Sequence, residues 1–206
     1  GIYMVDGTDP EIEDCGLADN SATFQGGGIY FARVKSPEIE SDCKFFGNEA
    51  KFGGGIYFED NTKPDINGNF FQGNMAKNGG AIYVNWNEAD IYNNRFHLNE
   101  SSGNGGAIFV PAGMSPSITN NFYWGNIAGS KKAPTMSIIM QEGEYEQKGG
   151  AIFTGGSGAD PVITGNEFKA NEAPFGGAVA VIDTSHPIIN NNKYIDNLGG
   201  LMDGNI

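Results

Sequence analysis

One phrase recurs along this chain at nearly constant spacing. It consists of an Asn followed, after a short gap, by Gly-Gly, then Gly or Ala, then Ile or Val and usually an aromatic residue. Clear copies begin at Asn48, Asn74, Asn99 and Asn171. A phrase repeated at a fixed interval indicates one small unit stacked on itself, so each position of the phrase becomes a column along the molecule. The chain is therefore predicted to be a solenoid.

A second recurring residue, an Ile eight or nine positions before the Asn, sets the length of the unit. Its copies are 25 to 27 residues apart, except for one step of 45: Ile12, Ile39, Ile66, Ile91, Ile118, Ile163 and Ile189. The long step indicates an insertion at 129–148. Short apolar segments between Gly, Asn and Pro, with no sustained helical period, favour strands. We predict an all-β parallel β-helix over residues 1–206, with about seven to eight coils of ~26 residues.

Two columns of polar residues follow from this alignment. The repeat Asn is expected to form a ladder of amides that bond from coil to coil: Asn20, Asn48, Asn74, Asn99, Asn126, Asn171 and Asn197. Cys15 and Cys43 share a column that holds Asn in the later coils. Stacked strands place their Cα atoms ~4.8 Å apart, within reach of a disulfide, although parallel side chains strain the bond. A disulfide and two stacked free thiols both remain open.

The paired motifs of the repeat carry a resemblance to a known family. Phe71-Gln72-Gly73-Asn74 is followed by Gly79-Gly80-Ala81-Ile82, and the same pair recurs in other coils. This pattern resembles the F-x-x-N and G-G-A-[ILV] repeat of the chlamydial polymorphic outer membrane proteins. The resemblance implies a right-handed β-helix and an adhesin-like passenger, extracellular or on the cell surface, with a glycan or a host or neighbouring surface protein as partner. Because the chain opens inside a repeat, we expect a segment of a longer protein, or a subunit that associates end to end.

An aromatic column follows the Ile of the Gly-Gly phrase and is the candidate binding surface. Side chains alternate along a strand, so this column and the Ile cannot share a face. If Ile points inward, the aromatic residues form an outer stripe that suits sugar rings or a partner. The alternative places the aromatic residues in the core. The column consists of Tyr30, Tyr57, Tyr83, Phe109 and Phe153.

Charge narrows the choice of ligand. A net charge of −13 and a pI near 4.4 argue against nucleic acid and anionic membrane surfaces, and no apolar run is long enough to span a bilayer. Carboxylates stack in the early coils, where Ca²⁺ or plain solvation would relieve their repulsion. No other cofactor or metal is expected. These carboxylates are Glu11, Glu13, Glu38, Glu40, Asp65 and Asp90.

Catalysis finds less support in the sequence. Ser115, Asp160 and His186 share a loop column, but the acid lies between the Ser and the His, the wrong order for a triad. The remaining loop candidates come from coils too far apart for one acid/base pair: Asp60, Trp86, Glu88, Asp183 and His186. We therefore expect a non-catalytic segment with an adhesive, carbohydrate-binding or structural role. The alternatives are a fragment of a polysaccharide lyase or hydrolase and a filament-forming subunit.

Overall fold

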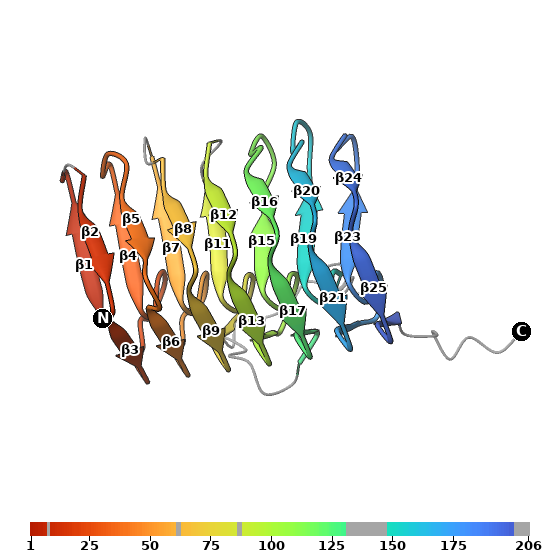
Figure 1. Ribbon diagram of the computed structural model, residues 1–206, viewed down its shortest axis with the longest axis horizontal. Coiled ribbons are helices and arrows are strands. Elements are labelled where there is room, and N and C mark those ends of the chain that lie inside the picture. The colour runs from red at the N-terminus through yellow and green to blue at the C-terminus, as the bar shows by residue number, and fades with distance from the viewer. Residues whose placement is uncertain (8, 61–62, 86–87, 131–147, 200–206) are drawn as a thin grey trace, which may run out of the picture.

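The computed structural model describes residues 1–7, 9–60, 63–85, 88–130 and 148–199. Within these ranges the backbone winds into a stack of coils in which every strand pairs in parallel with its counterpart in the next coil (Figure 1). The strands have only two to four residues each. Gly and Asp or Asn residues in left-handed conformation separate many of these strands. The parallel β-helix predicted from the repeat is confirmed.

Three seven-stranded sheets and one five-stranded sheet form the walls. The first sheet contains β1 (Ile2–Val5), β4 (Ile29–Ala32), β7 (Ile56–Glu59), β11 (Ile82–Asn85), β15 (Ile108–Val110), β19 (Ile152–Gly155) and β23 (Val179–Ile182). The second sheet contains β2 (Glu11–Glu13), β5 (Glu38–Glu40), β8 (Asp65–Asn67), β12 (Asp90–Tyr92), β16 (Ser117–Thr119), β20 (Val162–Thr164) and β24 (Ile188–Asn190).

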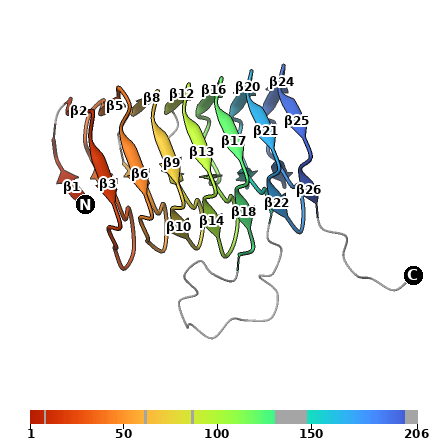
Figure 2. The same cartoon turned by 60° about the horizontal axis from the view of Figure 1, so that its bottom comes forward.

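The third and fourth sheets lie side by side in the rotated view (Figure 2). The third sheet contains β3 (Gly16–Ala18), β6 (Lys44–Phe46), β9 (Phe70–Gln72), β13 (Arg95–His97), β17 (Phe122–Trp124), β21 (Glu167–Lys169) and β25 (Lys193–Ile195). The short fourth sheet contains β10 (Met75–Ala76), β14 (Glu100–Ser101), β18 (Ile127–Ala128), β22 (Glu172–Ala173) and β26 (Leu198–Gly199).

The core consists of like residues stacked on like residues. Ile29 pairs in register with Ile56, and Phe45 pairs with Phe71. The Phe45 and Phe71 rings lie 4.6 Å apart between centroids and nearly parallel, and both side chains are fully buried. Because each coil offers its neighbour the same shape, the core fills without any coil needing its own packing solution.

The predicted asparagine ladder runs through the buried bend between the third and fourth sheets. Asn74 shows the repeating pattern: its Nδ2 donates to Oδ1 of Asn99 at 2.9 Å and to the carbonyl oxygen of Phe45 at 2.9 Å. Its backbone N–H donates to the same Oδ1 of Asn99 at 3.0 Å. The ladder also crosses the predicted insertion, since Asn126 Nδ2 donates to Asn171 Oδ1 at 2.9 Å. Each amide of this kind therefore satisfies two buried backbone groups of the preceding coil, as Asn74 does for the carbonyl of Phe45 and the N–H of Asn48, and also bonds to the amide of the following coil.

A second ladder contains the cysteine column. Asn69 Nδ2 donates to Asn94 Oδ1 at 3.2 Å, and Asn69 Oδ1 accepts the backbone N–H of Cys43 at 3.2 Å. Cys43 Sγ in turn accepts the backbone N–H of Cys15 at 3.4 Å and donates to the carbonyl oxygen of Ile12 at 3.3 Å. Both cysteines are free thiols, so stacked thiols, and not the disulfide, describe this structure. The Cys43 thiol takes the place that an amide oxygen has in later coils.

This arrangement predicts unequal thiol reactivity. Burial raises the pKa of Cys43, which leaves little thiolate, whereas Cys15 is partly exposed. A maleimide reagent should label Cys15 in the folded protein and both thiols after denaturation, as measured by intact mass. A Cys15→Ser variant should lose the native label. Unfolded, unreduced protein that takes up no label would instead establish the disulfide.

The predicted insertion at 129–148 is described only at its ends. The backbone N–H groups of Gly129 and Ser130 each donate to the carbonyl oxygen of Ser101 at 2.8 Å. At the other end, the N–H of Lys148 donates to Asn104 Oδ1 at 2.9 Å. Residues 131–147 lie outside the described residues, as does Trp86. The insertion thus begins after β18 and ends before β19.

Candidate functional site

The predicted aromatic column lies on the outer face of the first sheet. Ile29 and Phe31 are fully buried in the core, and Tyr30 between them points the other way. Tyr57 stacks between Tyr30 and Tyr83, with ring centroids 5.8 Å and 5.1 Å away. Of the two placements that the sequence left open, the structure has the outer one.

This column is nevertheless poorly suited to stacking a sugar. Each inner ring has a neighbouring ring against both of its faces, so only ring edges point outward. Tyr57 is 5% exposed and Phe153 4%, and Phe52 packs edge-on against Tyr83 with centroids 5.3 Å apart. Burial raises the pKa of Tyr83 to about 12. The rings of the column stack on one another and so stabilise the sheet. The expectation that this outer stripe offers free ring faces to a sugar or a partner needs revision.

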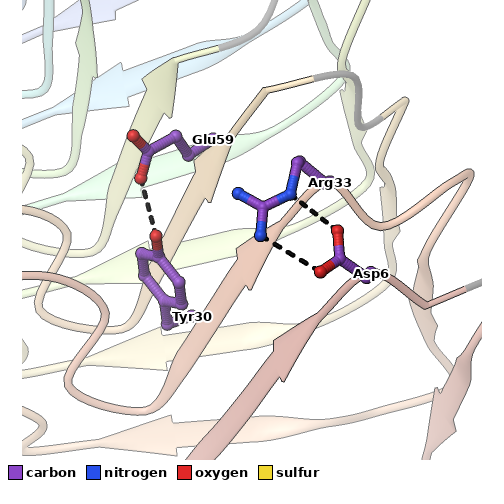
Figure 3. A network of polar contacts seen from close by, with 4 residues as sticks. All are labelled: Asp6, Tyr30, Arg33 and Glu59. Carbon is purple, nitrogen blue, oxygen red and sulfur yellow. Dashed lines mark hydrogen bonds and ion pairs between the residues drawn. The ribbon is translucent and has the colours of Figure 1, made fainter.

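A polar network contains residues of β4 and β7 and residues that directly follow β1 and β4 (Figure 3). Arg33 donates to both carboxylate oxygens of Asp6, at 2.6 and 3.1 Å. That hydrogen bond holds the pKa of Asp6 below its usual value. Tyr30 Oη donates to Glu59 at 2.7 Å, and burial followed by this bond raises the pKa of the phenol. Of the two arginines in the chain, Arg33 is therefore committed to a carboxylate.

The acidic column stacks on the outer face of the second sheet as predicted. Glu11 pairs in register with Glu38, and the ligand oxygens of Glu11, Glu13 and Glu40 lie within 4.8 Å of one another. Burial, with smaller contributions from nearby carboxylates, raises the pKa of Asp65. Three carboxylates at this distance could hold a hard cation. They also face solvent, which relieves their repulsion without one.

The loop residues considered for catalysis do not assemble into an acid/base site. The backbone N–H of His186 donates to Asp160 Oδ1 at 2.6 Å, and its Nδ1 lies 3.7 Å from the same oxygen. Within the described ranges no hydrogen bond joins Ser115 to His186. Asp60 and Asp183 occupy left-handed turns in different coils. The structure thus brings together only Asp160 and His186 of these candidates.

A groove lies on the outer face of the third sheet, and sequence reasoning missed it. Its volume is about 460 Å³, within the range of about 300–1,000 Å³ that is common for small-ligand sites. β9, β13 and β17 supply its lining from three consecutive coils, a length of ~10 Å along the stack. The lining residues are Phe70, Arg95, Phe96, His97, Phe122 and Trp124.

Two outward columns flank the groove, and they differ from the tyrosine column. On one side Arg95 lies in register between Phe70 and Phe122, so these two rings are not stacked on each other. On the other side His97 stacks on Trp124, with centroids 4.5 Å apart. Trp124 is 45% exposed. Its other neighbour in the register is Lys169, which leaves the indole one face without a ring.

Electrostatics in the groove come from two side chains. Burial lowers the pKa of His97, which favours the neutral imidazole at pH 7. Arg95 is exposed and carries the permanent charge. Between them in β13, Phe96 also lines the groove, while its side chain is fully buried in the core. The groove therefore combines aromatic walls with one cation.

The sequence did contain a signal for this groove. It lies in the residues that directly precede and follow each member of a core column, because these residues point outward. Phe71, Phe96 and Tyr123 form the inward column, so the residues one position before and after each must point outward. Phe122 and Trp124 flank Tyr123 in this way. An alignment of those flanking positions would have found aromatic residues in three successive coils.

Comparison with known families agrees with this architecture. The family model described as a right handed beta helix region matches residues 1–123. The chain belongs to the right-handed β-helix family. The predicted fold class, including its handedness, is confirmed. The match is to right-handed β-helices in general and does not show the specific repeat of the chlamydial proteins. Searches of curated proteins and of solved structures returned no match. None of the described segments of this right-handed β-helix forms a helix with the length and apolarity of a membrane span.

Proposed function

We propose that this right-handed β-helix is a non-catalytic, carbohydrate-binding segment, adhesin-like in its role and extracellular or on the cell surface. The observation that carries the proposal is the aromatic groove over β9, β13 and β17. The fold is compatible with adhesive and with hydrolytic families, so the site has to decide between them.

The groove has the properties that a sugar site requires. Aromatic rings with a free face pack against the C–H face of a pyranose, and polar groups at the edge receive its hydroxyls. Trp124 offers such a face, and His97, Arg95 and nearby Gln72 supply polar atoms. All of them stand on strands fixed by neighbouring coils, so little entropy is lost in ordering the site.

The groove lining supports binding and not hydrolysis. Glycoside hydrolysis generally needs two carboxyl groups about 5–10 Å apart across the scissile bond. None of the residues that line the groove is Asp or Glu. Aromatic residues and one guanidinium can hold a sugar without cleaving it.

Trp124→Ala is the direct test of this proposal. Loss of the indole removes the largest ring of the groove, so affinity for any saccharide bound by the wild type should fall at least about tenfold. A glycan array selects the ligand and calorimetry gives the affinity. Because Trp124 is 45% exposed, the fold should survive.

Phe24→Ala is the matched control, since Phe24 is another aromatic residue, 60% exposed, outside the groove. It should bind like the wild type. A wild-type protein that binds no saccharide, or a Trp124→Ala variant that binds as tightly, would refute the proposal. Release of reducing ends from a bound polysaccharide would assign the enzymatic alternative.

A further inference from the structure

The groove lies on the cationic face of an acidic protein. Among the outward positions of the third sheet are four cations and one carboxylate, in a chain of net charge −13: Lys44, Arg95, Lys169, Lys193 and Glu167. The carboxylate is already paired, since Lys193 Nζ lies 3.2 Å from Glu167. By contrast, the second sheet carries its carboxylates outward in the early coils. The charge is therefore segregated between two faces.

Arg95 has no carboxylate partner within the part of the chain that the structure describes. It lines the groove and lies in register between Phe70 and Phe122. Arg33, in contrast, makes a bidentate pair with Asp6 (Figure 3). A guanidinium is a planar donor that matches the two oxygens of a carboxylate or sulfate. Arg95 therefore offers this geometry to a ligand.

We propose that the groove selects acidic saccharides, and that Arg95 binds their carboxylate or sulfate group while the aromatic walls hold the sugar ring. This inference rests on the proposed carbohydrate-binding function and adds the class of ligand. Because the net negative charge of the protein repels an anionic ligand from most of the surface, the ligand should bind where cationic side chains are concentrated. Lys169, next to Trp124 in the register, extends the positive charge along the groove.

Substitution of Arg95, the one cation in the groove lining, tests this assignment. The probes are a glycan array with neutral, carboxylated and sulfated members, and a matched pair of trigalacturonate and its methyl ester. Acidic members should dominate wild-type binding. Arg95→Gln should weaken their binding about tenfold or more and weaken the binding of neutral members far less, because the glutamine amide can still bond to a hydroxyl. Added salt should weaken acidic binding in the wild type and have less effect in the variant.

Arg33→Gln is the control, because it removes the same charge outside the groove, and it should bind acidic saccharides like the wild type. The failures can be told apart. If neutral saccharides bind best, and Trp124→Ala weakens them while Arg95→Gln does not, carbohydrate binding stands and selection of acids is refuted. If no saccharide binds, both proposals fall. Equal losses in Arg95→Gln and Arg33→Gln would show a general charge effect and also overturn the assignment.

Discussion

Asn99→Ala is expected to destabilise the fold by about 4 kcal/mol. Asn99 is fully buried at the middle of the ladder. Its Oδ1 accepts two bonds from Asn74, and its Nδ2 donates to Asn126 Oδ1 and to the carbonyl oxygen of Phe71. Alanine leaves these partners without water to replace the amide, at a cost of roughly 1–3 kcal/mol for each unsatisfied group. Urea unfolding followed by circular dichroism measures the loss.

Asn67→Ala provides the control within the same solenoid. Asn67, in β8, accepts a single exposed bond from Asn93 Nδ2 at 3.1 Å. Its replacement should change stability by less than about 1 kcal/mol, because water takes over the lost bond. Asn99→Asp should be at least as damaging as alanine, since it loses the donor and buries a charge. Similar small losses for Asn99→Ala and Asn67→Ala would contradict a structural role for the ladder.

The stacking columns could be predicted from sequence because a solenoid is nearly one-dimensional. Once one Ile is aligned in each coil, parallel pairing fixes the partner of every other residue. The sequence therefore predicts the order and register of the ladder that contains Asn48, Asn74 and Asn99. It also placed Cys15 beside Cys43. Apart from the step across the insertion, where Asn126 contacts Asn171 over 45 residues, no ladder contact beyond about one repeat length had to be inferred.

The burial of a side chain by its neighbours, and the face of the strand on which it lies, could not be predicted in the same way. Tyr57 points out of the core as alternation requires, but the degree to which it is covered depends on neighbouring side chains. The thiol of Cys43 bonds to backbone atoms because it replaces an amide in a ladder, which its spacing does not reveal. Phe70 and Phe71 are adjacent and identical in sequence. Phe70 lies on the outer face of β9 and lines the groove, whereas Phe71 lies on the inner face and is buried in the core.

Gly80→Ala is expected to destabilise the protein by about 3 kcal/mol, for a reason different from that of Asn99. A Cβ at Gly80 would meet backbone atoms of the next coil: the carbonyl oxygen of Gly106, and the oxygen and nitrogen of Glu100 at 2.7 and 2.8 Å. Backbone atoms in a paired strand cannot turn away as a side chain can. Relief of the clash requires neighbouring coils to separate, which costs packing and hydrogen bonds together.

Gly16→Ala tests whether this loss comes from the close approach of coils or merely from the added methyl group. An added Cβ at Gly16, in β3, meets no atom within 4 Å, so its stability should stay within about 1 kcal/mol of the wild type. Denaturant midpoints of both variants give the comparison. A wild-type midpoint for Gly80→Ala would mean that the coils tolerate a wider spacing. The Gly-Gly phrase would then set the turn alone and not the distance between coils.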